Sequence, residues 1–269
     1  MEWFEAVLLG LLQGLTEFLP VSSSGHLEIG KALLGVETSD DLMFTTVVHA
    51  ATVLSTIVVF HKQIWGLLKG FFEFKYNDQT DYLLKIAVSM VPIFIVGVFF
   101  KDAVEGLFGS VHVVGFALLA TAVLLFFSDF ASRPGRASIF PANDYRNGIS
   151  YWQALAVGLG QAFAVIPGLS RSGTTISTGL ICGVRRDVMA QFSFLMVLVP
   201  ILGEAFLEVV GGGFSSSTVG ALPLCLGFLS AFLSGLFACK VMIAIVKKAR
   251  LSWFALYCLV VAAAIFIFG

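Results

Sequence analysis

The segment Gln13-Gly-Leu-Thr-Glu17-Phe-Leu-Pro20-Val-Ser22-Ser-Ser-Gly25-His26 decides the fold, because it interrupts a long apolar stretch with a polar loop. A similar loop follows 148 residues later, as Gln161-Ala-Phe-Ala-Val-Ile-Pro167-Gly-Leu-Ser170-Arg171-Ser172-Gly173-Thr174-Thr175. At this offset nine residues in a 35-residue window are matched by identical residues: Gly10, Leu11, Gln13, Ser22, Ser24, Gly25, Gly35, Val36 and Phe44. Each loop therefore places polar groups in surroundings that otherwise resemble hydrocarbon.

The composition excludes an ordinary soluble domain. Apolar residues make up 58% of the chain and charged residues 12%, and the mean hydropathy is +0.95. Soluble domains carry about twice that charged fraction, so most of the surface is expected to face lipid. The four cysteines lie in apolar stretches without metal-ligand spacing and are expected to be inert thiols. The residues Met1–Glu5 carry no basic charge, and no cleaved signal peptide is expected. The composition predicts an all-α polytopic membrane protein.

Six stretches are long and apolar enough for transmembrane helices, which need about 20 residues. They are 42–60, 83–100, 111–128, 188–210, 218–239 and 251–268. Two further regions, 3–36 and 151–184, hold an apolar stretch, a polar loop and a second short apolar piece. Neither has room for two crossings, so both are predicted to be re-entrant helix–loop–helix hairpins lining a cavity.

The basic residues predict the orientation of these spans. If 61–82 is cytoplasmic, then 13 of the 16 Lys and Arg residues lie inside, as the positive-inside rule requires. Those residues are Lys62, Lys69, Lys75, Lys85, Arg133, Arg136, Arg146, Arg185, Arg186, Lys240, Lys247, Lys248 and Arg250; Lys31 and Lys101 fall outside, and Arg171 lies in the second hairpin.

Three spans separate the two hairpins, so the hairpins are expected to enter the membrane from opposite faces. This predicts an inverted-topology repeat within one integral membrane domain, residues 1–269. The first unit covers about 1–128 and the second about 150–269. Inverted repeats place functional groups near the midplane at discontinuous helices. Both polar loops are therefore expected to line one site.

Gln13 and Glu17 are the first candidate site residues. Their i, i+4 spacing places both on one face of the entering helix. A carboxylate within a membrane is costly without a partner or a cavity, so Glu17 is predicted to be a metal ligand or general base, with Gln13 as a neutral oxygen donor. The alternative is a solvated Glu17 near the outer headgroups, without function.

The run Ser22-Ser-Ser-Gly25-His26 is the second candidate. Pro20 ends the first helix, the serines cap the next one, and a helix N-terminus with free amides and hydroxyls binds anions. His26 can give or take a proton near neutral pH. Ordinary helix capping and a structurally satisfied histidine are the alternatives. No role is expected for His49, His61 or His112.

The second loop repeats this pattern and adds the guanidinium of Arg171. An arginine at membrane depth needs an anion, and its fork matches phosphate oxygens in a bidentate manner. A structural salt bridge with Glu17 is the alternative. Together the loops supply a carboxylate, an imidazole, hydroxyls, an arginine and two helix N-termini. This set suits phosphate and, with a divalent cation, phosphoryl transfer.

At these residues the chain resembles the undecaprenyl-diphosphatase family, also called the bacitracin-resistance protein family. The resemblance rests on Gln13-Gly-Leu-Thr-Glu17-Phe-Leu-Pro-Val-Ser-Ser-Ser-Gly25-His26 and on Pro167-Gly-Leu-Ser-Arg171-Ser-Gly-Thr-Thr-Ile-Ser177, and it extends over essentially the whole length. It implies a multi-pass enzyme of the bacterial plasma (inner) membrane. The enzyme would hydrolyse undecaprenyl diphosphate to undecaprenyl phosphate and inorganic phosphate, recycle the lipid carrier for cell-wall synthesis and confer bacitracin resistance. Position 13 is Glu in some members, and here it is Gln.

The resemblance also implies roles by position. Glu17 and Gln13 would hold a divalent cation, Mg²⁺ or Ca²⁺. Ser23 or His26 would be the nucleophile or acid–base group, with water as a further candidate nucleophile. Glu17 and Arg171 complete the expected catalytic set. The expected diphosphate-binding residues are Ser22, Ser24, Gly25, Ser170, Arg171, Ser172, Gly173, Thr174 and Thr175.

A second hypothesis comes from the architecture alone: a transporter or flippase for an anion or a phosphorylated lipid, because inverted repeats with half-helix termini are common in transporters. Glu17 with His26 favours the enzyme, since an anion pathway needs neither a carboxylate nor a proton donor. A scaffold subunit without a site is disfavoured by the number of polar groups at membrane depth. The expected partners are a polyprenyl diphosphate, membrane lipids and a second copy of the chain in a homodimer, but no nucleic acid.

Overall fold

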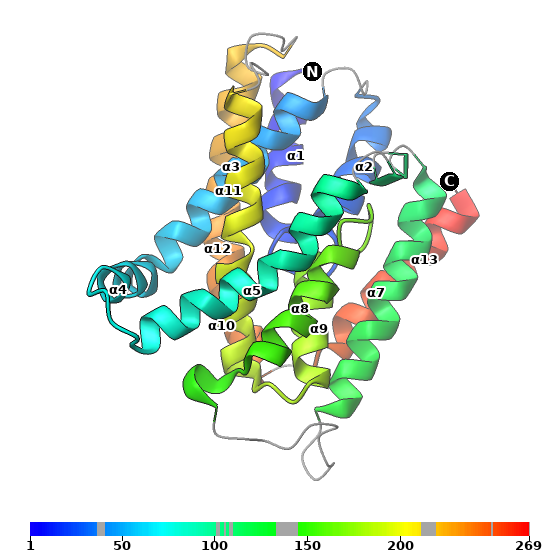
Figure 1. The fold of residues 1–269 in the computed structure, drawn as a ribbon. Coiled ribbons are helices and arrows are strands. Elements are labelled where there is room, and N and C mark those ends of the chain that lie inside the picture. Colours follow the sequence, from blue (N-terminus) through cyan, green and yellow to red (C-terminus); the bar gives the residue numbers. More distant parts are fainter. Residues whose placement is uncertain are drawn as a thin grey trace.

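The computed structural model describes residues 1–36, 41–100, 103–104, 106–107, 110–132, 145–210, 219–248 and 250–268, so Lys101, Arg133 and Arg136 of the charge pattern lie outside the described residues. Within these residues the regular elements are all helical (Figure 1). They are α1 Trp3–Thr16, α2 Ser23–Leu34, α3 Asp41–Val59, α4 His61–Phe71, α5 Asp78–Phe99, α7 Val111–Ala131, the 3-10 turn η2 Arg146–Gly148, α8 Tyr151–Phe163, α9 Arg171–Ile181, α10 Arg186–Met196, α11 Leu198–Val210, α12 Ala221–Lys248 and α13 Ser252–Phe268. The all-α prediction is confirmed.

Helices suited to crossing a membrane make up most of the bundle. By length and composition these are α5, α7, Arg186–Gly203, which joins α10 to α11, and α12; the bent pair of α3 and α4 adds a fifth. Only 28% to 44% of the apolar window in each of the four is buried inside the protein. The remaining apolar side chains face outward, as lipid contact requires, and the chain is a multi-pass membrane protein. The sixth predicted span, 251–268, is the apolar helix α13.

Two details of these spans differ from the prediction. The predicted span 188–210 is broken at Val197, where α10 ends and α11 begins. Pro200 explains the break, because a proline cannot bond to the carbonyl four residues earlier, here Met196, where α10 stops. The predicted loop 61–82 contains α4, which is bent by 76° from the preceding helix.

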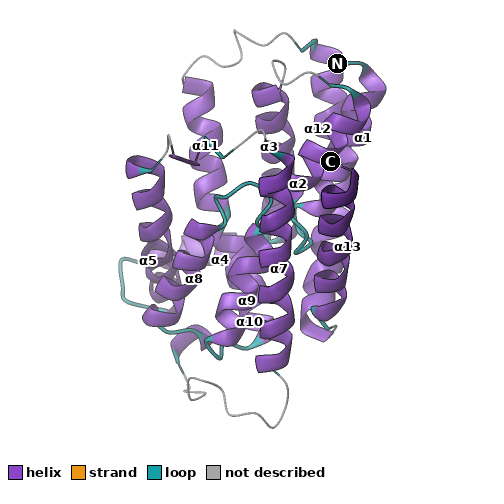
Figure 2. Cartoon of the chain, turned by 90° about the vertical axis from the view of Figure 1, so that its right-hand side faces the viewer, coloured by secondary structure: helices purple, strands orange, loops and turns teal. Residues whose placement is uncertain are grey.

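Both predicted re-entrant hairpins are helix–loop–helix units, α1 with α2 and α8 with α9. Their four helices have 11 to 14 residues, less than the ~20 residues that a full crossing needs. Figure 2 shows loop segments at about mid-height within the bundle, between the helices and away from either end. The short arms explain this depth, since each helix ends before it can reach the opposite face.

Each hairpin packs against a long helix of the other half of the chain. α1 packs most extensively against α12, and α8 packs most extensively against α5. Glycines at equivalent positions allow both contacts: a Cβ at Gly10 would lie 2.4 Å from the Gly227 carbonyl oxygen, and one at Gly158 would lie 2.3 Å from the Ser89 carbonyl oxygen. Small residues let helix backbones approach closely in membranes. The repeated glycine of the sequence thus has a packing function in both copies.

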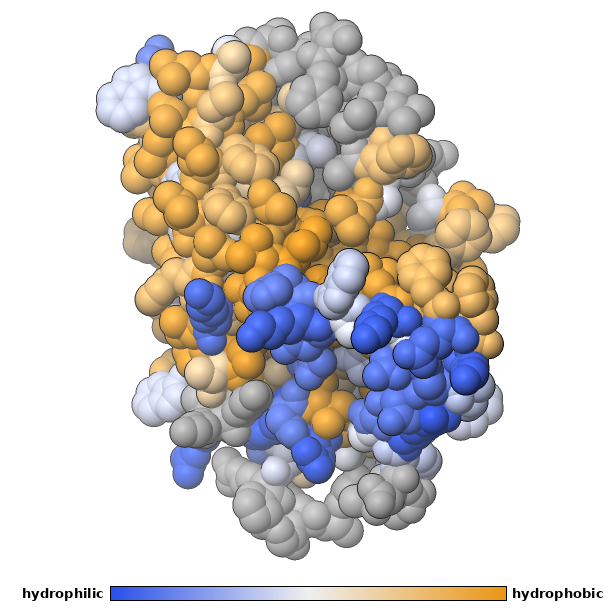
Figure 3. Space-filling view, turned by 90° about the vertical axis from the view of Figure 1, so that its left-hand side faces the viewer, coloured by the Kyte–Doolittle hydropathy of each residue, from blue (hydrophilic) through white to orange (hydrophobic). Residues whose placement is uncertain are grey.

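Polar and apolar surfaces are separated on the face that carries α4. Figure 3 shows apolar side chains over the upper part of this face and a group of polar side chains below. Exposed residues of α4 and the loop after it include Lys62, Lys69 and Lys75. The aromatic side chains of Trp65 and Phe74 are exposed beside them. Basic and aromatic residues together are typical of a membrane–water boundary.

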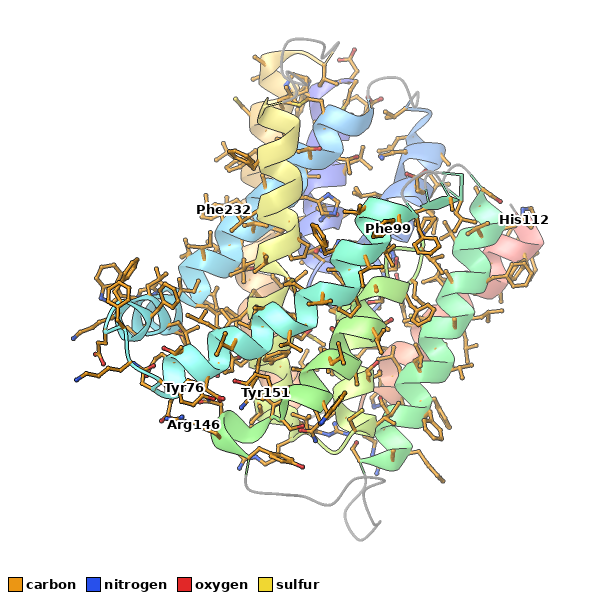
Figure 4. The ribbon with its side chains drawn as sticks, viewed as in Figure 1. Tyr76, Phe99, His112, Arg146, Tyr151 and Phe232 are labelled. Carbon is orange, nitrogen blue, oxygen red and sulfur yellow. The ribbon has the colours of Figure 1, made fainter. Side chains whose placement is uncertain are left out.

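A buried ion pair ties the second hairpin to α5 near this polar end. Lys85 Nζ lies 2.6 Å from Asp81 Oδ2 and donates to the Arg146 carbonyl oxygen at 2.7 Å. The hydroxyls of Tyr76 and Tyr151 donate to Asp81 Oδ1 at 2.8 and 3.0 Å. Figure 4 shows Tyr76, Arg146 and Tyr151 close together beneath α5 and α8. Because Asp81 and Lys85 are each 2% exposed, this network fixes the start of α8 relative to α5.

Candidate active site

The turns of the two hairpins contact each other. Ser172 Oγ donates to the Leu19 carbonyl oxygen at 3.1 Å, and the Gly168 amide donates to Ser24 Oγ at 3.5 Å. Gly25 also approaches the second turn: a Cβ there would lie 3.3 Å from the Gly168 Cα. Residues that are 143 to 153 positions apart therefore lie side by side in the interior.

The two turns are built by the same capping interaction. Ser22 Oγ accepts the Gly25 amide at 3.2 Å at the start of α2, and Ser170 Oγ accepts the Gly173 amide at 3.1 Å at the start of α9. Such side-chain caps satisfy amides that have no partner within the helix. Ser22 and Ser170 therefore cap helices, which is the alternative to a binding role that the sequence left open. The hydroxyl groups of the neighbouring serines are not used in these caps and make other contacts.

Glu17 accepts two hydrogen bonds at the end of α1. Gln13 Nε2 donates to Glu17 Oε2 at 2.8 Å, and Ser23 Oγ donates to the same oxygen at 2.5 Å. The Glu17 side chain is 9% exposed. These contacts contradict the alternative of a solvated, unengaged Glu17. They also place the Ser23 hydroxyl against the Glu17 carboxylate, which can accept its proton.

Arg171 lies opposite this carboxylate at the start of α9. It interacts electrostatically with Glu17, and both residues line the same cavity. Among the described residues, no hydrogen bond or ion pair within 4.0 Å engages the Arg171 guanidinium. The predicted alternative of a structural salt bridge with Glu17 is therefore not formed. An unpaired guanidinium in a partly buried position suits an anionic ligand.

A small cavity of about 20 Å³ joins the two loops. This volume admits one water-sized ligand. Its polar lining comes from the two hairpins and from α3 and α10: Glu17, Thr52, Thr56, Gln161, Arg171, Ser172, Thr175 and Ser193. Its apolar lining is Phe18, Val53, Phe194, Val197, Leu198 and Ile201. A larger cavity of about 280 Å³, which includes Gln63, Asp78 and Gln191, contains none of the predicted site residues.

His26 does not line this cavity. Its Nδ1 lies 2.7 Å from the Ser22 carbonyl oxygen, and its Nε2 lies 2.8 Å from the Tyr257 hydroxyl on α13. Since a carbonyl only accepts, Nδ1 carries the proton of the neutral ring and Nε2 accepts from Tyr257. Ser23, three residues before His26, bonds to Glu17 instead. The structure therefore does not pair His26 with Ser23, the two residues that the resemblance offers as nucleophile or acid–base group.

The threonines of the second loop have different surroundings. Thr175 Oγ1 lies 2.7 Å from Ser193 Oγ and donates to the Arg171 carbonyl oxygen at 2.9 Å. Thr174 Oγ1 is buried without a hydrogen-bond partner. Thr175 therefore connects the loop to α10, and Thr174 is buried within α9.

Two residues beside Glu17 and Arg171 were not predicted. His49 on α3 places Nε2 3.7 Å from Glu17 Oε2. Gln161 lines the cavity, is 1% exposed, and has a side-chain oxygen without a partner. Gln161 is the repeat equivalent of Gln13, so the sequence contained a signal for it. No spacing rule connects His49 with Glu17, because they lie on different helices.

The donor atoms around Glu17 fit a divalent cation. The Gln13 side chain is fully buried and its Oε1 has no hydrogen-bond partner, while its amide nitrogen is held by Glu17. An unpaired buried oxygen is costly unless a ligand satisfies it. Carboxylate and amide oxygens are typical ligands of Mg²⁺ and Ca²⁺. The described residues contain no group of three or more His, Cys, Asp or Glu residues placed to hold a metal, so a cation beside Glu17 would need an amide oxygen as a ligand.

Comparison with known proteins shows the family to which the chain is similar. The model of the family described as bacitracin resistance protein BacA matches residues 6–264. A Bacteroides fragilis protein named undecaprenyl-diphosphatase is 53% identical over 265 residues, which cover 97% of this chain and 96% of the relative. Proteins of the same name from Parabacteroides distasonis and Christiangramia forsetii are 54% and 47% identical. They align over 96% and 100% of this chain, and over 95% and 99% of their own lengths.

Proposed function

The chain belongs to the bacitracin resistance protein BacA family, and we infer from this that it is an undecaprenyl-diphosphatase. It removes the terminal phosphate of undecaprenyl diphosphate and yields undecaprenyl phosphate and inorganic phosphate. Relatives that align over nearly the whole chain carry that name. The single structural observation that supports the chemistry is the Ser23–Glu17 hydrogen bond, which lies beside a cavity shared by Glu17 and Arg171.

Arg171 binds the diphosphate in this proposal. Its guanidinium has no ion-pair partner among the described residues, and the neighbouring Ser172 also lines the cavity. A guanidinium binds phosphate oxygens through two parallel hydrogen bonds, which fixes orientation as well as charge. In phosphoryl transfer the protein mainly positions the phosphate and neutralises its charge. The amides and hydroxyls at the starts of α2 and α9 complete the anion site.

Ser23 is the nucleophile in the proposed reaction, and Glu17 is its base. Ser23 Oγ attacks the terminal phosphorus while its proton passes to Glu17, to which it already donates a hydrogen bond of 2.5 Å. The bond between the terminal phosphorus and the bridging oxygen breaks, and undecaprenyl phosphate leaves. Water then attacks the phosphoserine and the bond from its phosphorus to Ser23 Oγ breaks. Glu17 returns its proton to Ser23 Oγ, and inorganic phosphate leaves with the two protons of the water. Atoms and charge balance with water as the only co-substrate.

Glu17 and Gln13 hold a divalent cation, Mg²⁺ or Ca²⁺, in this proposal. The fit rests on the buried, unpaired Gln13 Oε1 next to a carboxylate. When bound, such a cation neutralises charge on phosphate oxygens. The neutral Gln13 contributes an oxygen without adding a second negative charge beside the substrate.

The location of the site agrees with a lipid substrate. Apolar residues of the broken helix, among them Phe194, Leu198 and Ile201, lie beside the polar groups of the site, as expected for an enzyme whose substrate carries a prenyl chain. We also propose that the units about 1–128 and 150–269 form an inverted repeat, supported by the equivalent α1–α12 and α8–α5 contacts, and that the protein resides in the bacterial plasma membrane. Bacitracin resistance follows from the family.

The test is release of inorganic phosphate by the purified full chain in detergent. The expected result is release from undecaprenyl diphosphate that requires a divalent cation, stops with a chelator, and is lost in Glu17→Ala and Arg171→Ala. Unchanged release in both variants would refute the site assignment. If the wild type releases no phosphate but moves a labelled prenyl phosphate across proteoliposomes, the transporter hypothesis replaces the enzyme.

A further inference from the structure

The side chain of Gln161 is the strongest feature of the site that has no role assigned. Gln161 lies on the last turn of α8, is 1% exposed, and lines the cavity that Glu17 and Arg171 also line. Its Oε1 is buried and has no hydrogen-bond partner within the described part of the chain. A buried carbonyl oxygen of this kind is costly unless a ligand donates a hydrogen bond to it. Gln161 is therefore a candidate for contact with a group that enters the cavity.

The orientation of the Gln161 amide identifies the atom that a ligand can use. Its Nε2 donates to Met90 Sδ on α5 at 3.9 Å, and Met90 is not among the residues that line the cavity. With the nitrogen turned to α5, Oε1 is the polar atom of this side chain that remains for a ligand. An amide oxygen only accepts hydrogen bonds, so the ligand has to be a donor.

The other polar groups of the lining narrow the choice of ligand. Five hydroxyl groups already have hydrogen-bond partners in the protein: Thr52, Thr56, Ser172, Thr175 and Ser193. The remaining groups are two acceptors, Gln161 Oε1 and the Glu17 carboxylate, and one donor, the Arg171 guanidinium. Ionised phosphate oxygens only accept, so they suit Arg171 but not Gln161.

A water molecule matches the acceptor that Gln161 presents. Water donates two hydrogen bonds, and a cavity of about 20 Å³ has room for one water. The same cavity is lined by Glu17, whose Oε2 accepts the Ser23 hydroxyl at 2.5 Å. A water bound to Gln161 therefore lies beside the carboxylate that serves Ser23 in the proposed reaction.

We propose that Gln161 Oε1 positions the water that hydrolyses the phosphoserine. This rests on the proposed function, in which Ser23 carries the phosphate after the first step. Oε1 accepts one hydrogen bond from the water and turns the water oxygen toward phosphorus. The water oxygen bonds to phosphorus, the bond from phosphorus to Ser23 Oγ breaks, and Oγ takes the proton held by Glu17. Both protons of the water leave with inorganic phosphate.

Gln161 is a positioning residue in this step and not a base, because both protons of the water go to the phosphate. Glutamine orients the attacking water in the same manner in GTPases. The first step, attack by Ser23, involves no water. Loss of the Gln161 oxygen therefore slows the second step alone.

Gln161→Met separates the two steps. Methionine is a long, flexible side chain that can fill the space beside Met90, but it has no oxygen acceptor. We expect kcat for phosphate release to fall about 100-fold, as for a misplaced reactant. KM should fall by the same factor, because kcat/KM contains only the steps up to the departure of undecaprenyl phosphate. A merely structural role would lower kcat/KM as well.

The lifetime of the phosphoenzyme is the direct measurement. The purified full chain in detergent is mixed with undecaprenyl diphosphate that carries ³²P in its terminal phosphate, chased with unlabelled substrate, and quenched in acid. The label should leave Gln161→Met about 100-fold more slowly than it leaves the wild type. The double variant with Ser23→Ala should take up no label.

Gln13→Met is the matched control, because Gln13 is the equivalent residue of the first hairpin. Its amide nitrogen donates to Glu17, and Gln13 is not among the residues that line the cavity. Gln13→Met removes support from the base of the first step, so it should lower kcat/KM. This is the opposite pattern to that of Gln161→Met.

The possible failures are distinguishable. Label that leaves Gln161→Met as fast as the wild type would overturn the inference, as would a fall in kcat/KM equal to the fall in kcat. Phosphate release by a wild type that takes up no label would also overturn it and would leave the phosphatase in place. A wild type that releases no phosphate from undecaprenyl diphosphate would refute the proposed function and this inference together.

Discussion

The Ser23 hydroxyl donates a hydrogen bond of 2.5 Å to Oε2 of Glu17, across the turn that joins α1 to α2. The same oxygen accepts the Gln13 amide, and Arg171 interacts with this carboxylate electrostatically. His26, the nearest imidazole in the sequence, is instead held between the Ser22 carbonyl and Tyr257. A carboxylate, and not an imidazole, is therefore in place to take the proton of Ser23.

Arg171→Lys tests whether the guanidinium fork is needed. Lysine keeps the positive charge but loses the bidentate geometry. We expect kcat/KM for phosphate release to fall by roughly 10- to 100-fold, equivalent to about 1.4–2.7 kcal/mol of transition-state stabilisation. Arg185→Lys is the control, because Arg185 is an exposed residue paired with Asp187. Equal rates for Arg171→Lys and the wild type would contradict bidentate binding.

Tyr257→Phe tests the contact between α13 and the first hairpin. It removes the donor to His26 Nε2, and the loss of such a hydrogen bond costs about 1 kcal/mol. We expect the melting temperature in detergent to fall by roughly 2–4 °C. Tyr82→Phe is the matched comparison, because the buried Tyr82 hydroxyl has no partner, and its removal should leave stability unchanged or higher. Equal destabilisation by both variants would refute the role of the hydrogen bond.

Gly10→Ala and Gly158→Ala test the helix crossings of the two halves. The added methyl groups would lie 2.4 Å and 2.3 Å from backbone oxygens of α12 and α5, so the helices have to separate. Overpacking of this kind costs about 1–3 kcal/mol, which a thermal unfolding measurement in detergent detects. Gly66→Ala in α4 is the control: nothing lies within 4 Å of the new methyl group, and alanine favours a helix by about 0.5–1 kcal/mol. A loss of stability at Gly66 equal to that at Gly10 would contradict the packing argument.

Asp81→Asn tests the network that joins α5 to the second hairpin. Asp81 and Lys85 are each 2% exposed, so the substitution leaves a buried ammonium without its carboxylate. Removing one partner of a buried ion pair costs about 3–5 kcal/mol, and we expect a large fall in the unfolding temperature. The double variant Asp81→Leu with Lys85→Met removes both charges and should recover much of the loss. If the double variant is no more stable than Asp81→Asn, the charge pair is not the cause.

The sequence predicted the elements that depend on local pattern. Hydropathy located the spans, and the polar loops located both hairpins, because apolar length and helix-ending residues act within one segment. The capping residues Ser22 and Ser170 could be read in the same way. The repeat also predicted that the loops lie together, which the contact of Ser172 with Leu19 now shows.

Features that depend on packing between distant helices could not be predicted. His49 lies 32 positions after Glu17 on another helix, and only the tertiary fold brings its Nε2 to 3.7 Å from the carboxylate. The pairing of His26 with Tyr257 spans 231 positions, and no local pattern indicates it. The break at Val197 was predictable from Pro200. Helix α4 was predictable because the apolar residues Ile64, Leu67, Leu68 and Phe71 recur at helical spacing.

Single-turnover release of inorganic phosphate from undecaprenyl diphosphate by wild type and Ser23→Ala tests the central claim most directly. We predict that the substitution lowers the rate by roughly three orders of magnitude or more, as expected for loss of a nucleophile. Ser110→Ala, which removes an exposed hydroxyl that forms no helix cap, should release phosphate at the wild-type rate. Phosphate release by Ser23→Ala at a rate close to that of the wild type would contradict the account.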